Sequence, residues 1–146
     1  MKIHPIQQEF NLLYKELDDL YRETAVVQGL SDSAQMVLYT ICELGDGCLQ
    51  KDICDRCFLT KQTVHSSVRK LEREGFVNLT AGKGRDRLLS LTEMGRALAE
   101  RTIHPLMDAE YRAMETLSTE EQTTLLQLTQ TYLSALRREV RQIIAD

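Results

Sequence analysis

The chain has 146 residues, of which 42% are hydrophobic and 27% are charged, and its net charge is −4. This length suits one globular domain or a small domain with a dimerisation arm, and the composition is that of an ordinary soluble protein. No apolar run approaches the ~20 residues of a membrane span, and no signal-peptide core opens the chain, so we expect a cytoplasmic protein in which disulfides are unusual.

The first third of the chain predicts two helices. Apolar residues recur at helical spacing over residues 6–27, and Gly29 ends this helix. Ser31 is the expected N-cap of the next helix, with Asp32 and Gln35 as an alternative capping pair. The buried stripe of this second helix comprises Val37, Leu38, Ile41 and Leu44. The glycine-rich turn at residues 45–47 closes it.

Residues 49–92 carry the most informative pattern. A short helix over residues 49–58, a tight turn at residues 59–60 and a second helix over residues 63–74 are followed by the stop signal Gly75. Phe76 and Val77 then lead through a basic loop at residues 81–87 to an apolar return at residues 88–91. The order helix, turn, helix, strand, loop, strand predicts a winged helix-turn-helix, so the fold class is mainly α (α+β) with a small β-hairpin wing.

The last third of the chain predicts long helices. Thr92 and Glu93 can cap and start one of them, and Pro105 should kink or interrupt it near His104. Residues 118–121, Ser-Thr-Glu-Glu, form a capping box before the final helix. We expect residues 31–99 to form the winged lobe, and residues 1–30 and 100–146 to form a helical dimerisation region within one intertwined domain. The terminal helices carry apolar stripes that need a partner. A second copy of the chain is the economical one, and packing within a monomer is the alternative.

Charge is unevenly distributed along the chain. Residues 61–87 hold seven Lys and Arg against three acids, a net of +4, which leaves −8 for all other residues. A basic module in an acidic frame favours binding of a polyanion by one face, whereas accidental clustering on a solvated surface is the simpler interpretation.

The second helix of the unit suits the DNA major groove. Val64, Val68 and Leu71 fall on one face and should anchor the helix on the core, while polar and basic side chains fall on the other. We expect Gln62 to pair with adenine, and Arg69 with guanine or a phosphate. In the wing, Arg85 and Arg87 should share one strand face, with Asp86 on the other, and one arginine should enter the minor groove. The predicted DNA-binding residues are Lys61, Gln62, Thr63, His65, Ser66, Arg69, Arg73, Lys83, Arg85 and Arg87.

Other reactive residues suggest weaker hypotheses. Cys42, Cys48, Cys54 and Cys57 lie within sixteen residues, and they are interpreted as structural thiols, with oxidation sensing or metal binding as alternatives. Cys54 is expected to be a small buried residue of the first helix of the unit. No motif for catalysis, for a cofactor or for a metal protease is present, so we expect no enzyme activity, no cofactor and no metal site.

Several motifs resemble those of the MarR family of winged helix-turn-helix transcriptional regulators. They are LQKDIC at residues 49–54, KQTV at 61–64, VRKLEREGFV at 68–77 and LTEMG at 91–95. The resemblance covers nearly the whole chain. It implies a homodimer with terminal helices at the apex and two winged lobes below, which binds a pseudo-palindromic operator, usually as a repressor. It also implies that a small effector could release the DNA.

The chain departs from the family pattern at three places. Leu49 stands where the family usually has a capping Ser or Thr, so Gly47 or Cys48 should cap the helix instead. His65 stands where Ser or Asn is common, and the wing motif is only approximated by residues 85–87. Two other functions stay open: a winged-helix module that binds proteins rather than DNA, and a thiol- or metal-responsive sensor.

Overall fold

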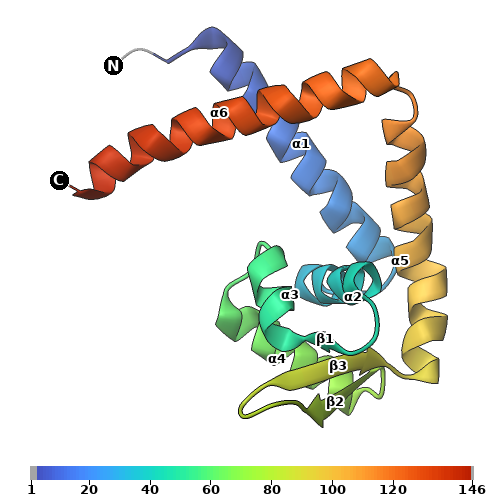
Figure 1. Cartoon of the computed structure of the whole chain (residues 1–146). Helices are drawn as coiled ribbons and strands as arrows, with labels where there is room; N and C mark the ends of the chain where they lie inside the picture. Colours follow the sequence, from blue (N-terminus) through green and yellow to red (C-terminus); the bar gives the residue numbers. More distant parts are fainter. Residues whose placement is uncertain (1–2, 146) are drawn as a thin grey trace. The chain divides into compact units, whose positions relative to one another are not determined.

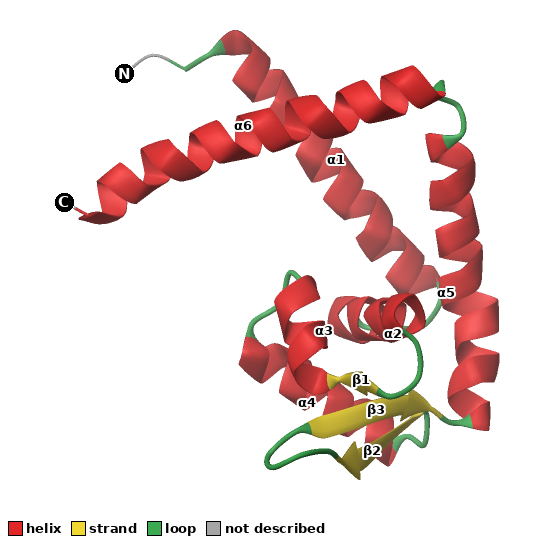
Figure 2. Ribbon diagram, viewed as in Figure 1, coloured by secondary structure: helices red, strands yellow, loops and turns green. Residues whose placement is uncertain are grey.

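The computed structural model describes residues 3–145, and the chain divides into two compact units at Pro105–Leu106. Helices dominate, and a small sheet lies in the first unit (Figures 1 and 2). The described elements are α1 (Pro5–Val27), α2 (Asp32–Leu44), β1 (Cys48–Leu49), α3 (Gln50–Arg56), α4 (Lys61–Arg73), β2 (Val77–Ala81), β3 (Arg87–Leu91), α5 (Glu93–Met114) and α6 (Thr119–Ala145). The predicted fold class, mainly α with a small β-hairpin, is confirmed.

The sheet formed by the described residues is antiparallel, with the strand order β1-β3-β2. β2 and β3 form the predicted hairpin, in register from Val77 opposite Leu91 to Ala81 opposite Arg87. β1, which the sequence did not predict, places Leu49 opposite Leu88. Because β1 takes the two residues before Gln50 into the sheet, α3 begins later than the predicted helix over residues 49–58, and it ends earlier, at Arg56.

The core of the first unit lies among α2, α3, α4, α5 and the sheet. Its side chains include the predicted inward stripes of α2 and α4, except Leu44, which is half-buried, and most are less than 2% exposed. They include Val37, Leu38, Ile41, Ile53, Val64, Val68, Leu71, Val77, Leu89, Leu98 and Ile103. The burial of Val64, Val68 and Leu71 confirms that the predicted core face of α4 is packed rather than solvated.

Four helix starts match the sequence signals. Ser31 Oγ accepts a hydrogen bond from the Ala34 N–H at 3.1 Å, and Thr92 Oγ1 accepts one from Gly95 at 3.0 Å. The capping box of α6 is complete, because Glu121 Oε2 accepts the Ser118 N–H at 2.7 Å while Ser118 Oγ accepts the Glu121 N–H at 3.2 Å. Thr60 caps α4 in the same way, as described below.

The start of α3 has no such cap. Leu49 occupies the N-cap position without a side-chain hydrogen bond, so the expected cap by Gly47 or Cys48 is wrong. Gly47 serves the sheet instead, since its N–H donates to Leu89 O at 2.7 Å and contacts Ser90 Oγ at 3.1 Å. The pairing of β1 with β3 therefore holds the chain where α3 begins.

Asp46 joins three segments of the lobe. Its Oδ2 accepts a hydrogen bond from Arg96 of α5 at 2.7 Å, and its Oδ1 accepts the Leu91 N–H of β3 at 2.8 Å. The bond from Arg96 and then the bond from Leu91 lower the pKa of the Asp46 carboxyl, since both favour its charged form. The turn after α2 is thereby attached to the base of the hairpin and to the start of α5.

The helix α5 continues through Pro105, so of the predicted kink or interruption the interruption is wrong, and the kink stays a prediction. Proline lacks the N–H that would bond one turn back, yet the residues on both sides keep helical geometry. The boundary between the two compact units falls at this same residue.

The terminal helices expose apolar side chains. In α1 the residues Leu12, Leu13, Tyr14, Leu17 and Leu20 are all about half exposed or more, and Ala25 is the buried residue of this helix. In α6 the large exposed apolar residues are Leu125, Leu126, Leu128, Tyr132, Leu133, Leu136, Val140, Ile143 and Ile144. The exposure of so many large apolar side chains is typical of helices that bind a partner. Among the described residues, no helix has the length and apolarity needed to cross a bilayer.

Candidate nucleic-acid interface

The helix α4 is held firmly on the core at its inner face. Thr60 Oγ1 accepts the Thr63 N–H at 3.2 Å and so caps the helix, which begins at Lys61, two residues earlier than the sequence predicted. Val64 and Val68 are fully buried and Leu71 is 2% exposed. Because these residues are packed on the core, the helix turns its opposite face outward in one fixed orientation.

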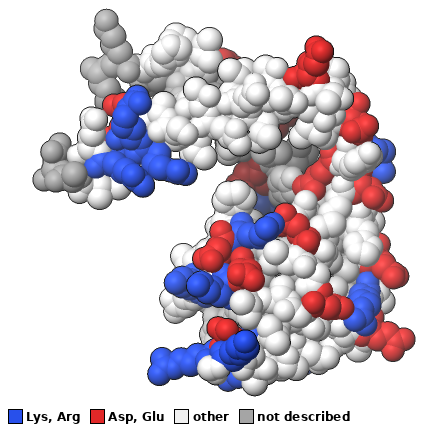
Figure 3. All heavy atoms as spheres, in the orientation of Figure 1, with Lys and Arg blue, Asp and Glu red and all other residues white. Residues whose placement is uncertain are grey.

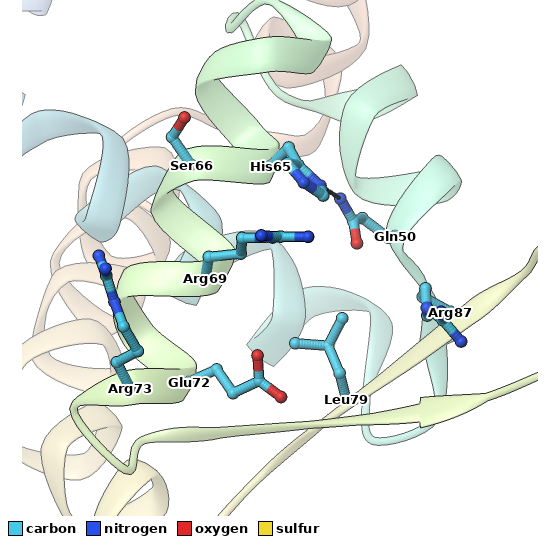
Figure 4. Close-up of a pocket in the computed structure, with 8 residues that line it drawn as sticks. All are labelled: Gln50, His65, Ser66, Arg69, Glu72, Arg73, Leu79 and Arg87. Atoms are coloured by element: carbon cyan, nitrogen blue, oxygen red, sulfur yellow. Dashed lines mark hydrogen bonds between the residues drawn. The ribbon is translucent and has the colours of Figure 1, made fainter.

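A hollow of about 600 Å³ opens between the outer face of α4, the start of α3 and the hairpin (Figure 4). Five of the ten predicted DNA-binding residues line it: His65, Ser66, Arg69, Arg73 and Arg87. Three further lining residues were missed by the sequence analysis: Gln50, Glu72 and Leu79. The hollow therefore combines residues from four elements, α3, α4, β2 and β3.

The charges in the hollow favour an anion. It contains the guanidinium groups of Arg69, Arg73 and Arg87 against the single carboxylate of Glu72. None of these four side chains forms an ion pair with another described residue, whereas the neighbouring Lys70 lies 3.9 Å from Glu74. Arginines without a protein partner are available for the forked hydrogen bonds that this side chain makes with phosphate or guanine.

His65 is the one hollow-lining residue of α4 that the structure shows bonded to another element. Its Nδ1 lies 3.1 Å from the amide Nε2 of Gln50 (Figure 4). Gln50 is the first residue of α3, directly after β1. The sequence offered no signal for this contact, because it depends on a two-residue strand that has no readable alternation.

The first turn of α4 holds the other predicted residues of this helix. Lys61 and Gln62 are exposed and do not line the hollow, while Thr63 is half-buried. The Thr63 hydroxyl lies 2.8 Å from that of Thr60, so it already has a protein partner. The backbone N–H groups and Lys61 are therefore the stronger groups for an anion at this helix start.

The hairpin carries the remaining basic residues at its projecting end. Gly84 adopts a φ of +62°, which suits a residue without a side chain, and the Gly82 N–H donates to Asp86 O at 2.9 Å. Lys83 and Arg85 lie in the tip and Arg87 begins β3, so the expected shared strand face of Arg85 and Arg87 is wrong: the turn interrupts the alternation. Figure 3 shows Lys and Arg atoms gathered at this end of the hairpin, on the lower left of the view.

The thiols are half-buried and weakly acidic. Burial raises the pKa of all four, that of Cys42 to about 11, which disfavours the reactive thiolate. Cys54 is half-buried rather than buried, because the fully buried side chain of α3 is its neighbour Ile53. Within residues 3–145 no group of His, Cys, Asp and Glu has the arrangement of a metal site. No observation on these residues favours the sensor alternative.

Comparisons with known proteins extend these observations. Residues 28–87 match the model of the MarR family. A MarR family regulator from Neisseria meningitidis is 23% identical, with a TM-score of 0.81 over 96% of this chain and 99% of that chain. MepR from S. aureus, solved as a DNA complex, is 21% identical, with a TM-score of 0.69 over 92% of this chain and 99% of that one.

A MarR family regulator from Listeria monocytogenes, described as putative and solved with a 26mer DNA, is 19% identical, with a TM-score of 0.70 over 95% of this chain and 92% of that chain. No curated protein sequence matches this chain significantly. The fold shared with these structures extends over nearly the whole chain, and the family match covers the elements that build the hollow. The resemblance predicted from the sequence motifs is confirmed: residues 28–87 match the MarR family model, and the fold of the chain is that of the solved MarR family regulators.

Proposed function

We propose that this protein is a transcriptional repressor that binds double-stranded DNA, with α4 in the major groove. The observation that carries the proposal is the row of unpaired arginines, Arg69, Arg73 and Arg87, in one hollow shared by α4 and the hairpin. Arginine clusters of this kind neutralise phosphates and read guanine. The DNA complexes solved for the S. aureus and Listeria proteins support the same role for this fold.

Each predicted residue has a place in this mode of binding. Lys61 and the first turn of α4 take a phosphate, while Gln62, His65, Ser66 and Arg69 face base edges. Lys83 and Arg85, in the hairpin tip, reach for the adjacent minor groove, where a narrow A·T-rich tract attracts arginine. Arg73 and Arg87 contact the phosphates of the DNA backbone between the two grooves.

A homodimer is the assembly that we propose. The apolar surfaces of α1 and α6 support it, because a soluble monomer rarely exposes so many large apolar side chains. We assign residues 1–30 and 100–146 to the dimerisation region and residues 31–99 to the lobe. Two symmetry-related copies of α4 then match a pseudo-palindromic operator with half-sites about 10 bp apart. Release by a small effector, which the family resemblance implies, stays a prediction.

The test is DNA binding by the purified protein at several salt concentrations. Fluorescence anisotropy with the DNA upstream of its own coding sequence should show an affinity that falls steeply as salt rises. Arg69→Ala should weaken binding and relax base preference, with a loss of roughly 5- to 100-fold. Arg85→Ala should weaken binding with less effect on major-groove preference. Arg101→Ala is the matched control, since Arg101 is exposed on α5 and does not line the hollow.

Two results would contradict the proposal. Equal affinity of Arg69→Ala, Arg85→Ala and the wild type would show that the hollow and the tip do not contact DNA. An affinity without salt dependence would instead favour a module that binds proteins. Sedimentation velocity at the concentration of the binding assay checks the assembly separately, and a monomer there would remove the basis for a two-fold symmetric operator.

A further inference from the structure

The contact between Gln50 and His65 joins two elements that are each fixed by other interactions. Gln50 follows β1, whose Leu49 is paired with Leu88 of β3. His65 follows the fully buried Val64 of α4. Because both backbones are held in place, the two side chains start from fixed points, and the 3.1 Å contact between the Gln50 amide Nε2 and the His65 ring Nδ1 favours one orientation of the imidazole.

The orientation of the Gln50 amide, with Nε2 toward the ring, favours one tautomer of His65. In this orientation the amide NH₂ group donates and Nδ1 of the neutral ring accepts, so Nδ1 carries no hydrogen. The hydrogen of the neutral ring is then on Nε2, and no described residue bonds to Nε2. The exposed ring therefore offers one hydrogen-bond donor from the wall of the hollow that also holds Arg69.

A lone donor on a major-groove helix discriminates among bases. In that groove guanine presents two acceptors, N7 and O6, whereas cytosine presents only the N4 donor. A ring that is free to turn over or to change tautomer could donate or accept, and it would tolerate both bases. A ring restrained with hydrogen on Nε2 leaves the cytosine amino group facing another donor, which costs a buried hydrogen bond.

We propose that Gln50 is a positioning residue for base recognition. It holds His65 in the Nε2–H tautomer, so that His65 prefers guanine over cytosine at one position of each operator half-site. This inference rests on the proposed DNA binding, but its first half concerns the free protein alone. Gln50 itself stays off the bases and acts through the histidine ring.

The first experiment measures the tautomer without DNA. Long-range ¹H–¹⁵N spectra at about pH 8.5, where imidazole rings are neutral, distinguish a protonated Nε2 from a protonated Nδ1. The chain has three histidines, and the spectrum of His65→Ala identifies the signal of His65. We expect protonated Nε2 in the wild type and a mixture of tautomers in Gln50→Met, which keeps the length of the side chain but cannot donate. Protonated Nδ1 or an averaged ring in the wild type would overturn the assignment.

The second experiment measures base preference. The affinities of the wild type and of Gln50→Met are measured for half-sites in which each base is substituted in turn. At one position, Gln50→Met should prefer guanine over cytosine roughly 3- to 10-fold less than the wild type does. In the His65→Ala background, Gln50→Met should change nothing further, because its effect passes through the ring. An unchanged preference, or an equal effect in both backgrounds, refutes the positioning role.

The two experiments separate this inference from the proposed function. If the wild-type protein binds no DNA, the proposed function and the proposed base preference are both refuted. The spectra still show whether Gln50 controls the tautomer of His65. A protein that binds DNA and shows no loss of preference at any position in Gln50→Met keeps its function and loses only this inference.

Discussion

The close approach of Gly95 to Phe76 predicts that replacing Gly95 by alanine destabilises the protein, although glycine-to-alanine changes inside a helix are usually stabilising. Gly95 lies in the first turn of α5, and a Cβ added there would be 1.9 Å from the Phe76 carbonyl oxygen and 3.4 Å from Leu91 Cβ. That oxygen accepts the Thr92 N–H at 3.1 Å. To reach an ordinary separation of about 3.5 Å, the carbonyl or the helix must move by roughly 1.5 Å.

The magnitude follows from what this movement disrupts. Thr92 also donates its hydroxyl to Gly75 O at 2.6 Å and caps α5 through the Gly95 N–H. Loss of one or two of these hydrogen bonds costs about 1 kcal/mol each, and overpacking adds about 1 to 3 kcal/mol. The better helix propensity of alanine returns only about 1 kcal/mol. We therefore expect Gly95→Ala to lower the free energy of unfolding by about 1 to 4 kcal/mol.

Urea denaturation followed by circular dichroism tests this expectation, with the midpoint and slope compared at one protein concentration. Ala97→Gly is the matched control, because Ala97 is exposed on the same helix and its replacement should cost only about 1 kcal/mol. A Gly95→Ala protein as stable as the wild type, or more stable, would refute the close approach of α5 to the β2 strand start. The wing base would then not be held as the structure shows.

Two further predictions concern charged groups. Because the pKa of the Asp46 carboxyl is lowered from its ordinary value of 3.8, its ionised form stabilises the folded state above that value, and this contribution is lost as the pH falls through the lowered pKa. Asp46→Asn should thus lower the urea midpoint at pH 7, and the difference from the wild type should shrink below about pH 4. Glu72→Gln removes the only carboxylate of the hollow and should raise the affinity for random-sequence DNA about 5-fold at low salt, as the loss of ~1 kcal/mol of charge repulsion predicts. A lower affinity would show that Glu72 contributes an attractive contact.

The features that the sequence predicted are those encoded within one turn or one strand. The inner face of α4 follows from the spacing of Val64, Val68 and Leu71, and the helix starts follow from residues that bond three positions ahead. The residues between these positions, Arg69 among them, fall on the opposite, exposed face of the helix. The tip of the hairpin was harder, because period-two alternation holds only inside a strand, and Arg85 lies in the turn that separates Lys83 from β3.

The features that the sequence did not predict depend on pairing between distant segments. Leu49 illustrates the reason: leucine is a poor helix N-cap, and the local sequence favours Gly47 or Cys48 in its place. The structure instead places Leu49 opposite Leu88, so the hairpin forms the support that a capping side chain would otherwise supply. That same pairing sets Gln50 beside His65. A departure from the local pattern at residue 49 and the added contact at residue 50 thus have one cause, the short strand β1, and weakening β1 should disturb His65 as directly as replacing Gln50.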